Sequence, residues 1–236
     1  FRTRCDTETV LRLYERYGAS LTQHLRGMFA FAIWDRNRRE LLLARDRFGV
    51  KPLYYFVGSD GSLYFASEIK SILASDLIEP RPNYAVLPEV LSTRATSGAE
   101  TLFKGVHKLP AGSWARLRPD RHLQVEQYWN VADVARDAAA GPAPDLGRVI
   151  EESVIAHLVA DVPVGVFLSG GVDSGALCAL AARAASGPVK TFSIGFAERS
   201  FDELADARRT ASMYGTDHTE LEVDPDALDL LPRLVD

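Results

Sequence analysis

A polar, glycine-rich segment follows an apolar run that ends at Leu168. Residues 169–174 read Ser-Gly-Gly-Val-Asp-Ser. Glycines let backbone N–H groups approach an anion closely, and a helix that begins at such a turn adds roughly half a positive charge at its amino end. Ser169 and Ser174 add hydroxyl donors. The segment therefore has the chemistry of a phosphate-binding loop.

Better-known motifs do not account for this loop. No lysine follows Gly171, as a P-loop requires, and the G-x-G-x-x-G dinucleotide fingerprint is absent. Phe167 stands where the hydrolase pattern G-x-S-x-G would need glycine before Ser169. A tight strand-to-helix turn would explain Gly170 and Gly171, but it would not explain the whole polar run. The prediction is a phosphate loop of another type.

The elements that would position this loop follow two different patterns. Up to about residue 130, apolar runs separated by polar turns predict antiparallel strands. A helix is expected near the start, which Asp6 or Thr7 can cap and Gly18 ends, and a second short helix near residues 67–75. From residue 148 helices alternate with apolar strands, which predicts a parallel sheet covered on both faces. Residues 131–147, rich in Ala, Pro and Asp, are interpreted as a linker. The hairpin turns are expected at Asn37, Asp60-Gly61 and Pro119-Asp120.

Composition excludes several classes of protein. The 236 residues carry a net charge of -5, which argues against a nucleic-acid partner. Cys5 and Cys178 form neither a disulfide framework nor a metal motif, which suits a reducing, cytoplasmic compartment. No apolar run approaches the roughly 18 residues of a membrane span, and no signal peptide is expected. Because the chain opens on Phe1 rather than methionine, we expect it to be a piece of a longer protein.

Motifs in both halves resemble the glutamine-dependent asparagine synthetase family. In the second half the resemblance lies in ADVPVGVFLSGGVDSG, and in the first half it lies in RGMFAFAIWD, LLLARDRFGVKPLYY, YFASEIKSIL and VHKLPAG. It implies an α/β chain: the N-terminal part of an Ntn-type αββα antiparallel sandwich, then the start of a parallel-sheet ATP pyrophosphatase domain. Residues 1–130 would belong to a class II glutamine amidotransferase domain and residues 148–236 to the synthetase domain.

For the second half, the resemblance implies that the loop holds the pyrophosphate portion of ATP. Asp173 would also bind Mg²⁺. The backbones of Leu168 and Ile194 would flank adenine, while their side chains also suit core packing. The implied pyrophosphate-binding residues are Ser169, Gly170, Gly171, Asp173 and Ser174.

For the first half, the resemblance assigns Asp6 to the α-amino group of glutamine. From the residues alone, Asp6 serves equally well as a helix cap. Cys5 is expected to be inert, because no histidine or lysine lies close to it in sequence to activate a nucleophile. The family's nucleophile is an amino-terminal cysteine. This chain does not contain it, so no catalytic residue is assigned and the chain alone is expected to be inactive.

The function implied is a ligase reaction, the ATP-dependent amidation of aspartate with ammonia from glutamine. Related amide-forming synthetases of natural-product biosynthesis remain an alternative, as does a fragment that binds ATP or glutamine without turnover. The expected partners are the small molecules glutamine, aspartate and ATP. Neither a membrane nor a nucleic acid is expected, and a homodimer is left open.

Overall fold

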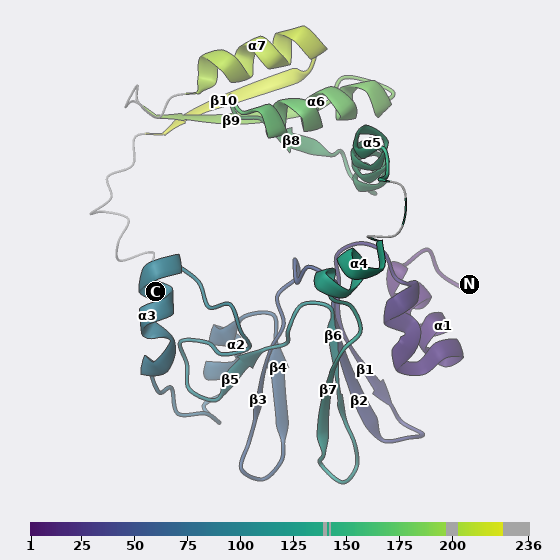
Figure 1. The fold of residues 1–236 in the computed structure, drawn as a ribbon, viewed down its shortest axis with the longest axis vertical. Helices are drawn as coiled ribbons and strands as arrows, with labels where there is room; N and C mark the ends of the chain where they lie inside the picture. The colour runs from purple at the N-terminus through teal and green to yellow at the C-terminus, as the bar shows by residue number, and fades with distance from the viewer. Residues whose placement is uncertain (139–140, 142, 197–202, 224–236) are drawn as a thin grey trace. The chain divides into compact units, whose positions relative to one another are not determined.

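The computed structural model describes residues 1–138, 141, 143–196 and 203–223 (Figure 1). The chain divides into two compact units, Phe1–Gly141 and Pro142–Asp236. No helix in these described ranges is long and apolar enough to cross a membrane.

The first unit contains two antiparallel sheets. One has the strand order β1-β2-β6-β7 and the other the order β4-β3-β5. The first sheet consists of β1 (Ala30–Asp35), β2 (Glu40–Arg45), β6 (Ser113–Leu117) and β7 (Leu123–Gln127). The second consists of β3 (Tyr54–Val57), β4 (Leu63–Ala66) and the short β5 (Val106–Lys108), which the sequence pattern did not predict.

The three predicted hairpins are confirmed. β1 pairs with β2, β3 with β4, and β6 with β7, each across a tight polar turn. Each turn contains a residue with positive φ, at Arg39 (54°), Gly61 (79°) and Arg121 (62°). Of the three, only Gly61 is a residue that adopts this conformation at no steric cost.

Helices close this unit on both sides. They are α1 (Asp6–Tyr17), α2 (Ile69–Leu73), α3 (Leu87–Thr93) and α4 (Val131–Ala138), with 3-10 turns at Gly18–His24 and Tyr84–Val86. α1 ends where Gly18 adopts a φ of 58° and donates its N–H to Tyr14 O. α4 lies inside the segment that was expected to be a linker. Its start is stabilised by Asn130, whose side-chain oxygen accepts the N–H of Ala132 at 2.8 Å.

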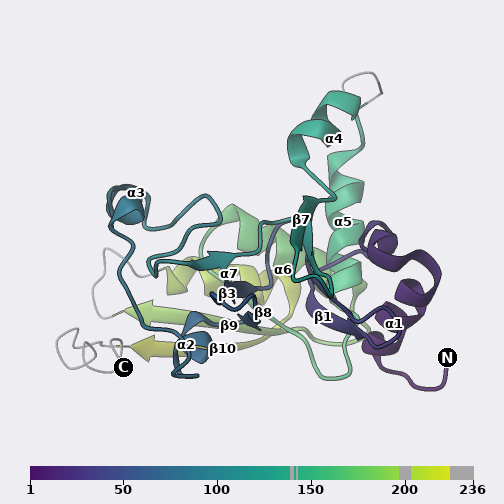
Figure 2. The same ribbon diagram turned by 90° about the horizontal axis from the view of Figure 1, so that it is seen from below.

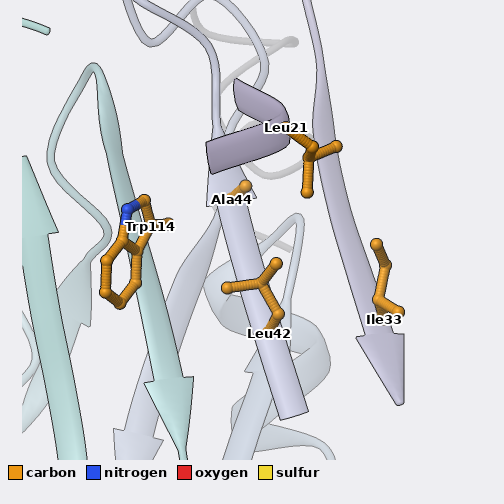
Figure 3. Close-up of a cluster of buried hydrophobic side chains, with 5 residues drawn as sticks. All are labelled: Leu21, Ile33, Leu42, Ala44 and Trp114. Atoms are coloured by element: carbon orange, nitrogen blue, oxygen red, sulfur yellow. The ribbon is translucent and has the colours of Figure 1, made fainter. Parts of the chain in front are cut away.

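Three apolar clusters define the layers. The cluster in Figure 3 joins the first sheet to the region of α1, the second cluster fills the space between the two sheets, and the third packs α2 on the outer face of the second sheet. The sequence of layers is therefore helix, sheet, sheet, helix, which confirms the predicted αββα arrangement. The buried residues of the first cluster are Leu21, Ile33, Leu42, Ala44 and Trp114.

The second unit is built on a three-stranded parallel sheet of order β10-β9-β8, as predicted. β9 and β10 run side by side in the same direction (Figure 2). Its elements are α5 (Leu146–His157), β8 (Gly165–Phe167), α6 (Val172–Ala184), β9 (Lys190–Phe196), α7 (Leu204–Tyr214) and β10 (Asp217–Val223). The segment FDELADARRTASMYG also predicts a helix over residues 201–215. The described helix α7 begins at Leu204, and residues 201 and 202 lie outside the described part.

The expectation that this sheet is covered on both faces is wrong for the residues described. α6 and α7 pack on one face, where Cys178, Ala207 and Ala211 are buried together with Leu168. Along β9, Thr191 and Ser193 are buried, whereas Phe192 and Ile194 are 38% and 52% exposed. Alternate residues of a strand point to opposite faces, so one face of the sheet is open in this part of the chain.

Candidate functional site

The predicted phosphate loop lies where β8 ends and α6 begins. Leu168, the first residue after β8, is 2% exposed, and its N–H donates to Phe192 O at 2.8 Å on the neighbouring strand. The next three residues, 169–171, are exposed, and α6 starts directly after them. The carboxyl ends of parallel strands are where α/β proteins place their ligands.

The hydroxyls of Ser169 and Ser174 tie the loop to the first turn of α6. Their Oγ atoms lie 2.8 Å apart, and Ser174 Oγ accepts the Ser169 N–H at 3.2 Å. Ser169 Oγ accepts the N–H of Gly171 at 3.2 Å. Ser174 Oγ also lies 3.1 Å from Gly171 O and 3.2 Å from Ser169 O, so its single hydrogen has alternative acceptors. The two serines thus hold the loop in a compact turn.

Gly170 packs against the start of α7. A Cβ at this position would stand 3.1 Å from Asp206 Cβ and 3.2 Å from Glu203 Cβ, closer than neighbouring side chains normally approach. The Gly170 N–H donates to Glu203 Oε2 at 3.0 Å. The sequence did not predict the role of Glu203, because 33 residues separate it from Gly170. No sequence motif links a glutamate at this position to the glycine of the loop.

A pocket of about 470 Å³ opens beside the loop, with Leu168 and Ile194 in its wall. The Leu168 carbonyl accepts the buried Ser193 hydroxyl at 2.5 Å, and its N–H is already used in the sheet. Among the described residues the Leu168 carbonyl has no second donor, which leaves one lone pair for a ligand. The lining residues are Phe167, Leu168, Ser169, Phe192, Ser193, Ile194, Glu203, Leu204 and Ala207.

Asp173 lies in the first turn of α6 with an exposed side chain. Among the described residues its carboxylate has no hydrogen-bond or ion-pair partner, so its oxygens are available as ligands. The same described residues contain no group of three or more His, Cys, Asp or Glu that could hold a metal ion. This donor set suits Mg²⁺, which commonly takes one or two carboxylates and completes its shell with phosphate oxygens and water.

In the first unit, Asp6 lines a separate pocket of about 350 Å³, together with Met28, Phe29 and Lys51. Asp6 is the first residue of α1 rather than its cap. The cap position is held by Cys5, and no side chain caps the helix there. The helix-cap role considered for Asp6 is therefore wrong. Lys51 adds a positive charge to the pocket, a feature that sequence reasoning did not single out.

Cys5 is exposed, and its Sγ lies 3.5 Å from Asp6 Oδ1. No histidine or lysine contact of Cys5 exists in the described part of the chain. That Cys5 is not a nucleophile stays a prediction.

Comparison with known families agrees with the two-part structure. The glutamine amidotransferase domain matches residues 1–129, and asparagine synthase matches residues 145–236. The chain belongs to the glutamine-dependent asparagine synthetase family. It is 37% identical to a putative glutamine-hydrolysing asparagine synthetase of Mycobacterium tuberculosis H37Rv, covering 100% of this chain and 37% of that protein.

Other relatives of this family are similar at the same level. Glutamine-hydrolysing asparagine synthetase 1 of Bacillus subtilis is 36% identical over 100% of this chain and 37% of its own length. Amidase chyE of Penicillium rubens is 38% identical over 94% of this chain and 35% of its own length. The chain thus spans little more than a third of the curated relatives that it matches.

Proposed function

We propose that this chain is part of a glutamine-hydrolysing asparagine synthetase. In the proposed reaction the β-carboxylate of aspartate attacks the α-phosphorus of ATP, giving β-aspartyl-AMP and releasing pyrophosphate. Ammonia, released from glutamine by the amidotransferase domain, then attacks the acyl carbon and displaces AMP. The ammonia nitrogen loses a proton, and asparagine is formed.

The observation that carries this proposal is the loop at residues 169–174. It places three backbone N–H groups, two hydroxyls and the amino end of α6 at the carboxyl edge of a parallel sheet. The N–H groups of residues 169–171 donate to Ser174 Oγ, Glu203 Oε2 and Ser169 Oγ, and phosphate oxygens would replace these acceptors. The donors and the helix amino end would then stabilise negative charge that develops on departing pyrophosphate. The neighbouring pocket, with Leu168 and Ile194 in its wall, is the proposed adenine site.

Asp173 is the proposed Mg²⁺ ligand of this site. Its exposed carboxylate belongs to the loop segment itself, in the first turn of α6, and it has no competing partner in the described structure. Bound Mg²⁺ would neutralise charge on the phosphate oxygens. Asp173 would hold the ion beside the pyrophosphate, while the two serines hold the loop in its compact turn.

In the first unit, Asp6 is proposed to bind the α-amino group of glutamine. Its carboxylate is exposed at the start of α1, in a pocket that also contains Lys51. One negative and one positive side chain on the same pocket suit an α-amino acid, which carries both charges. The nucleophile that would hydrolyse the side-chain amide is proposed to be a cysteine outside residues 1–236.

A related amide-forming reaction on another carboxylate is the second candidate. The chain is 38% identical to Amidase chyE and 37% identical to the asparagine synthetase of Mycobacterium tuberculosis H37Rv. Because the two similarities are equally high, the second candidate is retained. In both candidate reactions a carboxylic acid is adenylated by ATP while the loop holds the departing pyrophosphate. The two reactions differ only in which carboxylic acid is used.

The test is to supply the full-length protein with ATP, Mg²⁺, glutamine and aspartate, and to measure AMP and asparagine together. Formation of both in equal amounts supports asparagine synthesis. AMP formation that depends on a different carboxylic acid, with no asparagine, would select the second candidate.

A further inference from the structure

The Glu203 carboxylate occupies a loop amide that the proposed function needs for phosphate. Glu203 Oε2 accepts the Gly170 N–H at 3.0 Å, and both residues are exposed. Glu203 is the N-cap residue of α7, a position from which a side-chain oxygen can accept an N–H of the same helix. It makes no such capping bond and instead reaches across to the loop.

The contact is built into the packing of the second unit. Only glycine at position 170 lets the loop approach α7 closely, since a Cβ there would stand 3.2 Å from Glu203 Cβ. α7 is fixed on the sheet by buried Ala207 and Ala211, so the position of Glu203 does not depend on the loop alone. The carboxylate therefore stays within reach of the Gly170 amide.

We propose that Glu203 competes with phosphate oxygens for the Gly170 amide and thereby limits how tightly the loop holds pyrophosphate. This inference rests on the proposed function of the loop. When pyrophosphate binds, its oxygen replaces Glu203 Oε2 at Gly170, and the displaced carboxylate then lies beside a polyanion of like charge. When pyrophosphate is the product, return of Glu203 to the amide promotes its release.

The decisive variant is Glu203→Gln in the full-length protein. Glutamine keeps the length of the side chain and an acceptor oxygen, but it removes the charge that strengthens the bond to the amide and repels pyrophosphate. Inorganic pyrophosphate, titrated calorimetrically with and without Mg²⁺, is the probe. We expect the dissociation constant to fall about fivefold to tenfold, because charge-assisted hydrogen bonds are roughly twice as strong as neutral ones.

Asp206→Asn is the matched control. Asp206 lies on the same first turn of α7 and close to Gly170, but its carboxylate pairs with Arg209 at 3.3 Å and has no bond to the loop. The variant removes the same charge from the same neighbourhood. We expect it to change pyrophosphate affinity by less than about twofold, because the charge of Asp206 is already balanced by Arg209.

Each outcome decides a different question. If Glu203→Gln binds pyrophosphate more tightly and Asp206→Asn does not, the competition is supported. This holds also when the unmodified protein binds no pyrophosphate. Equal gains in both variants would overturn it in favour of a general charge effect, and weaker binding by Glu203→Gln would overturn it by showing that Glu203 assists binding. If neither the unmodified protein nor either variant binds pyrophosphate, both this inference and the proposed role of the loop fail. Unchanged affinity in a protein that does bind pyrophosphate overturns this inference alone.

Discussion

The hydroxyl oxygens of Ser169 and Ser174 lie 2.8 Å apart, and through them the loop is fastened to the first turn of α6. One of these serines comes before the helix and the other lies within it, so their contact fixes the angle at which the loop enters α6. This relationship supports the view that the loop amides are positioned before a ligand arrives.

Replacing Ser174 with alanine should loosen this turn. The variant loses the acceptor of the Ser169 N–H and the hydroxyl contact with Ser169 Oγ. We expect the free energy of unfolding to fall by about 1 kcal/mol and the KM for ATP to rise about tenfold. Chemical denaturation and ATP-dependent kinetics measure the two effects. The matched control is Ser212→Ala on the exposed part of α7, and an equal rise in KM there would contradict the proposed role.

Replacing Asp173 with asparagine should impair use of Mg-ATP without affecting stability. The side chain is exposed and makes no hydrogen bond or ion pair within the described structure. We expect kcat/KM for Mg-ATP to fall by about 10- to 100-fold, and the Mg²⁺ concentration needed for half-maximal rate to rise. Steady-state kinetics at varied Mg²⁺ are the measurement. Unchanged Mg²⁺ dependence would remove Asp173 from the metal site.

Asp46 should be essential for the stability of the first unit. Its side chain is 1% exposed and accepts four backbone N–H groups at 2.9–3.3 Å, from Phe29, Phe48, Val50 and Lys51. Asparagine would turn an NH₂ group toward some of these donors. We expect Asp46→Asn to lower the free energy of unfolding by about 3 kcal/mol, as measured by urea denaturation.

The control for Asp46 is Asp60→Asn. Asp60 also accepts hydrogen bonds, from the Ser62 N–H and hydroxyl, but it is exposed in a hairpin turn. We expect its replacement to cost less than about 1 kcal/mol. If the two variants were equally destabilised, burial of Asp46 would not be the cause.

Stability should fall in acid partly through Glu8. Hydrogen bonds from the Thr3 hydroxyl and from the N–H groups of Arg2 and Thr3 hold the pKa of Glu8 below its ordinary value of 4.5. A carboxylate whose pKa is lower in the folded state stabilises the fold above pH 4.5, and this contribution is lost as pH falls through the lowered pKa. Urea midpoints should therefore differ between Glu8→Gln and the unmodified protein at pH 7 and converge at the acid end.

Glu15→Gln, on the same helix, is the control for that pH series. Within the described residues, Glu15 pairs with Arg12 alone, at 2.9 Å on the exposed surface. Its pH profile should follow that of the unmodified protein. A constant difference between Glu8→Gln and the unmodified protein across the whole pH range would contradict the role given to the Glu8 charge.

The sequence predicted best where local chemistry decides the structure. Asn37 and the pair Asp60-Gly61 stand in tight turns between strands, and those hairpins are present. The short β5 was missed because three residues carry too little periodicity. α4 was missed because its eight residues stand in a segment rich in Ala, Pro and Asp that shows no clear apolar period. Such elements are decided by packing and capping contacts that a pattern does not display.

The candidate site was predictable in its loop but not in its surroundings. Residues 169–174 carry a dense local motif, whereas the contacts of Glu203 with Gly170 and of Ser193 with Leu168 join residues that are 33 and 25 positions apart. Both contacts depend on how α7 and β9 pack against β8. No local pattern encodes them, and they became visible only in the folded chain.

The most direct test of the central claim is to follow the full-length protein with ATP labelled at the α-phosphate, in the presence of Mg²⁺, glutamine and aspartate. If the loop at residues 169–174 binds pyrophosphate as the leaving group, the label appears in AMP, and Ser174→Ala and Asp173→Asn both slow its appearance. Label recovered in ADP instead of AMP would contradict the account, because it would show cleavage between the β- and γ-phosphates.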